Sequence, residues 1–133
     1  MKRFVKMFQP RFAGLVEEGS KRQTIRPVPK RMPAPGDLID CRAWTGAPYR
    51  SKQRKLCEGV ITAVWTCILN KDAVLLRAIE RSGATRQMSL RGLNADEFAK
   101  ADGFRDFEEM ALWFEETHQL PFTGILIKWE VKS

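Results

Sequence analysis

The sequence predicts an α+β fold, a small mixed β-barrel with flanking helices. Segments with the composition of strands outnumber segments with helical periodicity, and they lie mostly in the middle of the chain. Strands and helices do not alternate in the rhythm of βαβ units. At 133 residues the chain can bury one hydrophobic core, so we expect a single domain over residues 1–133.

The N-terminal third predicts a strand, a helix and a second strand. After a short strand at residues 3–8, Pro10 opens a helix at the position where its missing N–H does no harm, and Gly19 closes it. A strand follows at residues 23–26. Four prolines in residues 27–36 then exclude regular hydrogen bonding, which predicts a basic surface loop.

Composition and capping patterns predict the remaining elements. Asn94 and Asp106 each precede a glutamate by three residues, the reciprocal arrangement that caps a helix start. A polar and basic loop is expected over residues 45–55. The expected strands cover residues 37–44, 57–69, 73–80, 87–90 and 122–131, with turns at residues 70–72 and 82–84.

Positive charge is concentrated in one half of the chain. The whole sequence carries 23 Lys and Arg against 16 Asp and Glu, a formal net charge of +7. The first 55 residues hold 14 basic and 4 acidic side chains (+10), which leaves 9 against 12 (−3) for the remainder. Such a basic half attracts phosphate-bearing ligands, so we expect RNA, a nucleoside or a nucleotide as partner.

The sequence also bounds the compartment and the cofactors. No apolar run approaches the roughly 20 residues of a membrane helix, and the first residues lack the apolar core of a signal peptide, so we expect a cytoplasmic protein without a membrane partner. Cys41, Cys57 and Cys67 form no CxxC pair, which argues against a disulfide framework or a zinc site. We expect reduced thiols, no metal and no cofactor. The oligomeric state stays open.

Residues 19–26 bring several chemically capable side chains together. The run Gly-Ser-Lys-Arg-Gln-Thr-Ile-Arg contains a lysine that can act as base for a hydroxyl, and arginines that can hold a phosphate or a polarised carbonyl. The competing interpretation is a helix-stopping glycine before a strand whose Arg22, Thr24 and Arg26 alternate toward solvent.

The order of elements and motifs resembles the ASCH domain, a relative of PUA domains. The resemblance rests on the Gly-x-Lys and Thr-Ile-Arg segments of residues 19–26, on Pro35-Gly36-Asp37 before a strand, and on Asp102-Gly103-Phe104. It covers nearly the whole chain. It implies a PUA-like β-barrel with a cleft beside the helix-to-strand turn, in a family expected to bind RNA or nucleosides.

Within that family the chain is similar to the small bacterial N4-acetylcytidine amidohydrolases, which share a Gly-x-Lys-x-x-Thr-x-Arg pattern. The similarity implies Thr24 as nucleophile toward an amide carbonyl, Lys21 as its base, and Asp102 as the acidic partner at the position where the amidase pattern has Glu. Either burial or the neighbouring Arg22 and Arg26 would lower the pKa of Lys21. Both arginines are candidate substrate contacts, and Arg26 is either a structural or a phosphate-holding residue. The alternative is a plain surface ion pair between Lys21 and Asp102, worth under about 1 kcal/mol.

A second group of candidates lies in the polar segment after residue 44. An aromatic ring among cations suits single-stranded bases, whereas a solvated loop is the alternative. We expect Trp65 and Trp129 in the core and Trp44, at a strand end, as the exception. The expected contacts to nucleic acid or substrate in this segment are Trp44, Tyr49, Arg50, Lys52, Arg54 and Lys55.

Three functions therefore remain open from the sequence. The first is a protein that binds RNA or a nucleoside in a basic cleft and hydrolyses N4-acylated cytidine without a metal. The second is an RNA-binding module without catalysis. The third is a metal-independent ribonuclease in which Tyr49 and Lys55 take part. His118 stands alone at a helix end, without a set of candidate metal ligands around it in the sequence.

Overall fold

The computed structural model has an α+β fold and describes residues 1–79 and 83–132. Its strands form one mixed seven-stranded sheet, accompanied in the described residues by three helices. The elements follow the order β1 (Arg3–Met7), α1 (Pro10–Glu18), β2 (Gln23–Pro27), β3 (Leu38–Trp44), β4 (Gln53–Leu69), β5 (Val74–Ile79), β6 (Thr85–Leu90), α2 (Gly92–Ala101), α3 (Phe107–Thr117) and β7 (Phe122–Val131).

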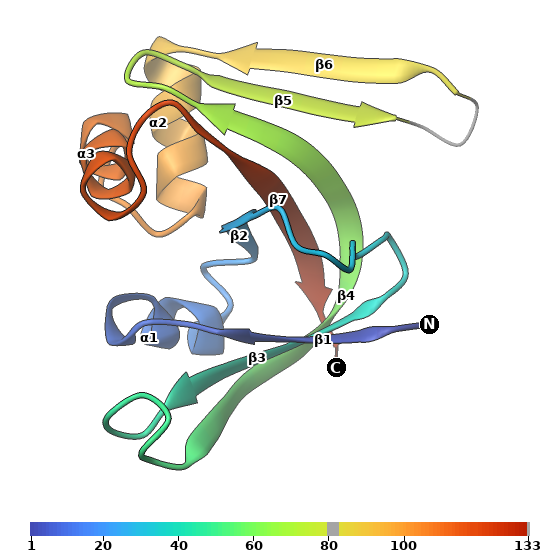
Figure 1. Cartoon of the computed structure of the whole chain (residues 1–133), viewed down its shortest axis with the longest axis vertical. Helices are drawn as coiled ribbons and strands as arrows, with labels where there is room; N and C mark the ends of the chain where they lie inside the picture. The colour runs from blue at the N-terminus through green and yellow to red at the C-terminus, as the bar shows by residue number, and fades with distance from the viewer. Residues whose placement is uncertain (80–82, 133) are drawn as a thin grey trace.

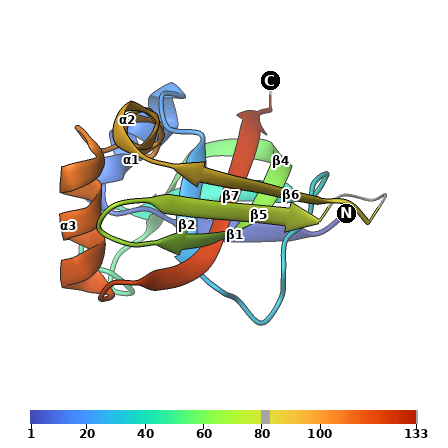
Figure 2. The ribbon, with the colours of Figure 1, turned by 90° about the horizontal axis from the view of Figure 1, so that it is seen from above.

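β4 is the central strand of the sheet. One of its edges pairs with β3 near the start and with β5 near the end, and its other edge pairs with β7. Figure 1 shows β4 as a long curved strand with the helices on its concave side. In the view from above in Figure 2, β5 starts near α3 and points away from it, and β6 runs back toward α2.

The sheet does not close, so the expected barrel is not confirmed. β1 pairs only with β3, β2 only with β7, and β6 only with β5 among the residues that the structure describes. A side-chain hydrogen bond from the Arg26 guanidinium to the carbonyl oxygen of Met7 joins the ends of β1 and β2. β1 and β2 therefore do not pair, although a closed barrel would need main-chain hydrogen bonds between them.

Most predicted elements are confirmed, with shifted boundaries. Pro10 is at the start of α1, and Gly19 ends this helix in the left-handed region at φ 88°. Asp106 caps α3 by accepting a hydrogen bond from the Glu109 amide. The predicted start at Asn94 is wrong, because α2 begins at Gly92 without a side-chain cap. Glu80 and Ser82, parts of a predicted strand and turn, lie outside the described residues.

One apolar core joins the sheet to the helices. Trp65 and Trp129 are buried in it, as the sequence predicts. Edge-to-face contacts between aromatic rings link α1 to the α2–α3 connection and to α3, with Phe12 against both Phe104 and Trp113. This aromatic cluster fixes the α2–α3 connection against α1, with Asp102 beside Gln23 at the start of β2. The largest fully buried side chains of the core include Val16, Ile39, Ile61, Leu69, Met110, Phe114, Ile125, Leu126 and Ile127.

Candidate active site

The turn after α1 directs Lys21 into the protein. Gly19 adopts φ 88°, which glycine reaches without steric cost, and its amide donates to the carbonyl oxygen of Val16. The amide of Lys21 then donates to the carbonyl oxygen of Leu15. Lys21 itself precedes β2, so the alternation of a strand does not control its side chain, which is only 3% exposed.

A second helix end holds Asp102 opposite this lysine. The amides of Gly103 and Phe104 donate to the carbonyl oxygens of Lys100 and Ala99, the two bonds of a Schellman motif at the end of α2. Gly103 supplies the required positive φ of 101°. A Cβ atom at Gly103 would lie 3.0 Å from Phe12 and 3.4 Å from the side chain of Lys21, so α2 ends directly against the lysine.

Lys21 and Asp102 form a buried ion pair. Nζ of Lys21 lies 3.3 Å from Oδ1 of Asp102 and donates at 2.5 Å to the backbone carbonyl oxygen of the same residue. Nε2 of Gln23 donates to the same Oδ1 at 3.3 Å. Because both charged residues are only 3% exposed, the alternative of a plain surface ion pair is wrong.

Burial shifts both groups of the pair toward their neutral forms. It raises the pKa of Asp102 above the usual aspartate value, against the opposing effects of Lys21 and Gln23. It also lowers the pKa of Lys21, against the attraction of Asp102. The physical cause is the loss of hydration around each charge. A buried lysine of this kind gives up its proton more readily than a free one, which is what a base requires.

Thr24 is held by Arg26 on the same face of β2. Nε of Arg26 donates to Oγ1 of Thr24 at 3.0 Å, and its Nη2 donates to the carbonyl oxygen of Met7 at 2.8 Å. The guanidinium lies 4.8 Å from the centre of the Phe8 ring. Thr24 is only 4% exposed, so the interpretation of residues 22, 24 and 26 as a solvent-facing series is wrong for Thr24.

These groups share one cavity of about 210 Å³. Lys21, Thr24, Arg26 and Asp102 line it together with the end of β1. The cavity therefore occupies the region where β1 and β2 fail to pair. Much of the remaining wall is aromatic and comes from Phe8, Phe12, Phe104, Trp113, Phe114 and His118.

The cavity is lined by an amine, a hydroxyl and a carboxyl group, but the amine and the hydroxyl do not contact each other. In the described residues, no hydrogen bond joins Lys21 to Thr24, because the ammonium is engaged by Asp102 and the hydroxyl by Arg26. A base must come within about 2.6–3.2 Å of the hydroxyl whose proton it takes, and such contacts are often longer in empty sites. To act as a base for Thr24, Nζ of Lys21 would have to leave the carbonyl oxygen of Asp102 and contact Oγ1 of Thr24.

Arg22, also predicted as a substrate contact, lies outside this cavity. Its side chain is exposed, and its carbonyl oxygen accepts a hydrogen bond from the amide of Trp129 on β7. It lines a different depression, together with Gln23 and Lys128. Arg22 therefore does not share this cavity with Lys21, since the chain before β2 turns the two neighbouring side chains in different directions, and contact of Arg22 with a substrate stays a prediction.

The other predicted contacts lie on the β3–β4 hairpin. Trp44 at the end of β3 is partly buried, and its ring centre lies 5.1 Å from that of Tyr49. Tyr49 is 90% exposed and adopts a positive φ of 63°. Arg50 and Lys52 follow it, both exposed, and no ion pair involves either of them in the described part of the chain. The hairpin tip thus presents two rings and two free cations.

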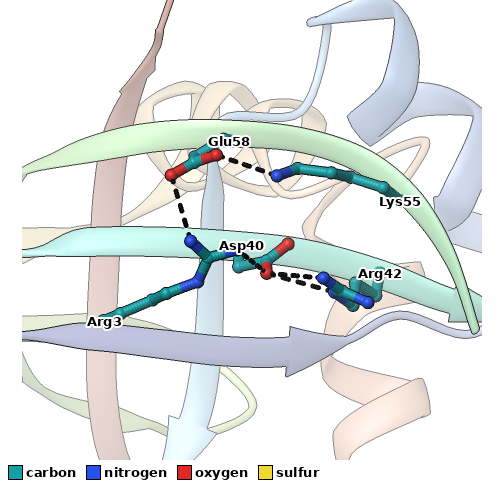
Figure 3. A network of polar contacts seen from close by, with 5 residues as sticks. All are labelled: Arg3, Asp40, Arg42, Lys55 and Glu58. Carbon is teal, nitrogen blue, oxygen red and sulfur yellow. Dashed lines mark hydrogen bonds and ion pairs between the residues drawn. The ribbon is translucent and has the colours of Figure 1, made fainter.

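Arg54 and Lys55 do not belong to this loop. β4 begins at Gln53, so both residues are in a strand, contrary to the predicted loop over residues 45–55. Arg54 pairs with Glu17 of α1 at 2.7 Å. Lys55 pairs with Glu58 at 2.8 Å, in the network that Figure 3 shows around the buried Asp40. Both cations are already partly neutralised by protein carboxylates.

Sequence reasoning missed Gln23 and the aromatic wall of the cavity. Gln23 lies between Lys21 and Thr24 in the motif but carried no chemical signal of its own. His118 and Trp113 line the cavity from α3, and the His118 ring stacks on Phe114 at 5.7 Å. The helical spacing of the α3 aromatics indicated a core face, and only the tertiary structure, which places α3 and β2 around the same cavity, makes that face a cavity wall.

Comparison with known proteins gives no family assignment. No family model matches the chain, and neither a curated protein nor a solved structure matches it. No helix in residues 1–79 and 83–132 has the length and apolar character needed to cross a membrane. Within the same residues, no group of three or more His, Cys, Asp and Glu side chains is placed to hold a metal ion.

Proposed function

We propose that this protein binds a modified nucleoside in the Lys21–Thr24–Asp102 cavity and hydrolyses an acyl group from the exocyclic amine of the base, with N4-acylated cytidine as the substrate class. The proposal follows from the resemblance to the ASCH domain. It takes the open sheet to be a PUA-like barrel in which β1 and β2 do not pair. The observation that carries it is the buried Lys21–Asp102 pair beside a threonine hydroxyl in one cavity.

The energetics of the pair favour a functional role. Desolvation of two charges costs about as much as, or more than, their mutual attraction returns, so a buried ion pair is a weak device for stability. Burial also perturbs both pKa values, which is a frequent property of active sites. The pair is therefore more easily explained as a means to prepare a lysine for proton transfer than as a structural clamp.

The proposed reaction uses the groups in distinct roles. Lys21, as the neutral amine, takes the proton of Thr24 while Oγ1 attacks the amide carbonyl carbon. Arg26 lies next to Thr24 and stabilises the negative charge that develops on the carbonyl oxygen. The protonated Lys21 or Asp102 then delivers the proton to the departing exocyclic nitrogen, and water hydrolyses the acyl-threonine.

The size and lining of the cavity support a single planar ligand group. At about 210 Å³ it is smaller than the roughly 300–1,000 Å³ of sites for drug-sized ligands. Its aromatic wall offers surfaces on which a base can stack. Asp102 is one methylene shorter than the glutamate of the amidase pattern, and a displacement of about 1 Å can reduce the rate roughly a hundredfold. We therefore expect slow turnover.

The decisive experiment incubates the purified protein with N4-acetylcytidine and follows cytidine and acetate by chromatography. Thr24→Val removes the hydroxyl at nearly constant shape and should abolish turnover, whereas Thr24→Ser should retain part of it. Lys100→Ala removes an exposed lysine on α2 and serves as the matched control. Turnover by Thr24→Val, or none by the wild-type protein on any acylated cytidine, would contradict the proposal.

A second candidate function, binding of single-stranded RNA, is favoured by a different observation. The Trp44–Tyr49 pair at the hairpin tip is flanked by the exposed cations Arg50 and Lys52, which form no ion pair with another described residue. Rings and cations in this combination suit sequence-tolerant binding of single strands. The ribonuclease alternative has no comparable support, since Lys55 is engaged by Glu58 in the sheet.

A further inference from the structure

Two of the three cysteines face each other across adjacent strands. Cys41 of β3 and Cys57 of β4 are direct partners in the antiparallel register. Cys41 is buried and Cys57 is partly exposed. Cys67, also on β4, is buried ten positions further along and pairs with Leu76 and Gly124 instead. The arrangement gives one partly exposed thiol, Cys57, and a buried thiol, Cys41, beside it on the neighbouring strand.

The spacing of such a pair is close to that of a disulfide. Directly opposite residues in an antiparallel sheet have Cβ atoms about 4.5–5.5 Å apart, whereas a disulfide needs about 3.5–4.5 Å. The sheet must therefore contract by about 1 Å at this point. The ladder is already irregular here, because the β3–β4 register shifts between Cys41 and Arg42.

We propose that Cys41 and Cys57 form a reversible cross-strand disulfide when the protein meets a peroxide. The proposal does not depend on the function assigned to the cavity. It concerns a modification of the sheet between β3 and β4, and the oxidant is hydrogen peroxide or an organic hydroperoxide.

The chemistry assigns a different role to each sulfur. The Cys57 thiolate attacks the terminal peroxide oxygen, so that an S–O bond forms, the O–O bond breaks and the leaving oxygen takes up a proton, as water from hydrogen peroxide or as the alcohol from an organic hydroperoxide. The thiol of Cys41 then attacks the sulfenic acid of Cys57. The S–S bond forms, the S–O bond breaks and the sulfenic oxygen leaves as water, so the two thiols lose two electrons and two protons to one peroxide.

The surroundings of the pair support this order of events. The neighbouring Cys41 thiol lowers the pKa of the Cys57 thiol, and Lys55 acts in the same direction, whereas burial and Asp40 oppose them. The Cys57 thiol and burial raise the pKa of Cys41. The attacking thiolate is thus the partly exposed residue, which is the environment of a reactive cysteine.

The test treats the reduced protein with hydrogen peroxide, unfolds it, labels the remaining thiols with iodoacetamide and measures the intact mass and the peptides. We expect a single label, on Cys67, and a linked pair of peptides that contain Cys41 and Cys57. Dithiothreitol should restore labelling of all three cysteines. Circular dichroism before and after oxidation checks that the fold is retained.

Three variants make the outcome specific. Cys67→Ser should form the same link at the same rate as the wild-type protein. Cys57→Ser should form no link, and Cys41→Ser should accumulate a sulfenic acid on Cys57 that dimedone traps. A link through Cys67, a link between two chains, or retention of all three thiols under conditions that oxidise free cysteine would overturn the proposal.

Discussion

Nζ of Lys21 lies 3.3 Å from Oδ1 of Asp102 and 2.5 Å from the carbonyl oxygen of the same residue, although the two residues are 81 positions apart in the chain. The contact joins the turn after α1 to the C-terminus of α2. Both residues line the cavity that also contains Thr24.

Removal of one partner should destabilise the fold more than removal of both charges. Lys21→Met leaves an uncompensated carboxylate in the interior, which costs about 3–5 kcal/mol, whereas replacement of a buried pair by neutral groups is often nearly neutral. We expect Lys21→Met/Asp102→Asn to recover most of that loss. Urea unfolding gives the free energies. A double variant no more stable than Lys21→Met would contradict this account of the pair.

The stability of Lys21→Met should depend on pH through Asp102. Burial raises the pKa of Asp102 in the folded protein, and loss of the lysine removes an opposing influence. A raised folded-state pKa gives stability that is present below the unfolded value of about 3.9 and lost as pH rises through the folded value. The free energy of unfolding of Lys21→Met should therefore fall as the pH rises from about 3.9 through the raised folded-state pKa of Asp102.

The double variant Lys21→Met/Asp102→Asn is the control for this pH effect. It lacks the titrating carboxylate but keeps every other ionisable group of Lys21→Met. Urea midpoints of the two variants, measured in parallel across the acidic range, should converge toward low pH and diverge toward neutral pH. Parallel curves would show that Asp102 does not titrate in this way.

Gly103→Ala should disturb the site as well as the backbone. A side chain at φ 101° costs about 1–3 kcal/mol in strain. Its Cβ would also lie 3.0 Å from Phe12 and 3.4 Å from Lys21. Gly36→Ala is the matched control, since Gly36 has φ 96° and open space around its Cβ position. We expect a larger loss in urea unfolding for Gly103→Ala, and equal losses would exclude the crowding.

If the hairpin tip binds RNA, substitutions of its aromatic rings and of its cations should affect the affinity and its salt dependence differently. The affinity for a short single-stranded RNA should fall with salt at a slope of about −0.7 per neutralised phosphate. Arg50→Ala/Lys52→Ala should make that slope shallower by about one to two units. Tyr49→Ala should cost about 1–3 kcal/mol and leave the slope unchanged.

The matched control for the cations is Arg54→Ala/Lys55→Ala. These residues are engaged by Glu17 and Glu58, so their removal should change the slope less than removal of Arg50 and Lys52. Fluorescence anisotropy at several salt concentrations measures all variants. Binding that is absent at low salt, or indifferent to Tyr49 and to both pairs of cations, would leave the hairpin without an RNA-binding role.

The sequence by itself determined most of the local structure. Pro10 and Gly19 set the ends of α1 because their backbone preferences act within one or two residues. Asp106 set the start of α3 in the same way, through a hydrogen bond to an amide three residues away. The Gly-x-Lys-x-x-Thr-x-Arg motif likewise identified Lys21, Thr24 and Arg26, which line one cavity.

Only the tertiary structure decided the burial of these residues and their partners. Lys21 meets Asp102 because two helix ends, far apart in the chain, pack against each other through Phe12 and Phe104. Arg22 turns away and Arg54 pairs with Glu17, although their local sequence suggested cations free for a ligand. The open sheet between β1 and β2 is likewise a property of the tertiary structure. Local sequence encodes backbone preference and charge, whereas burial, ion pairing and closure depend on contacts between distant segments, which no short motif specifies.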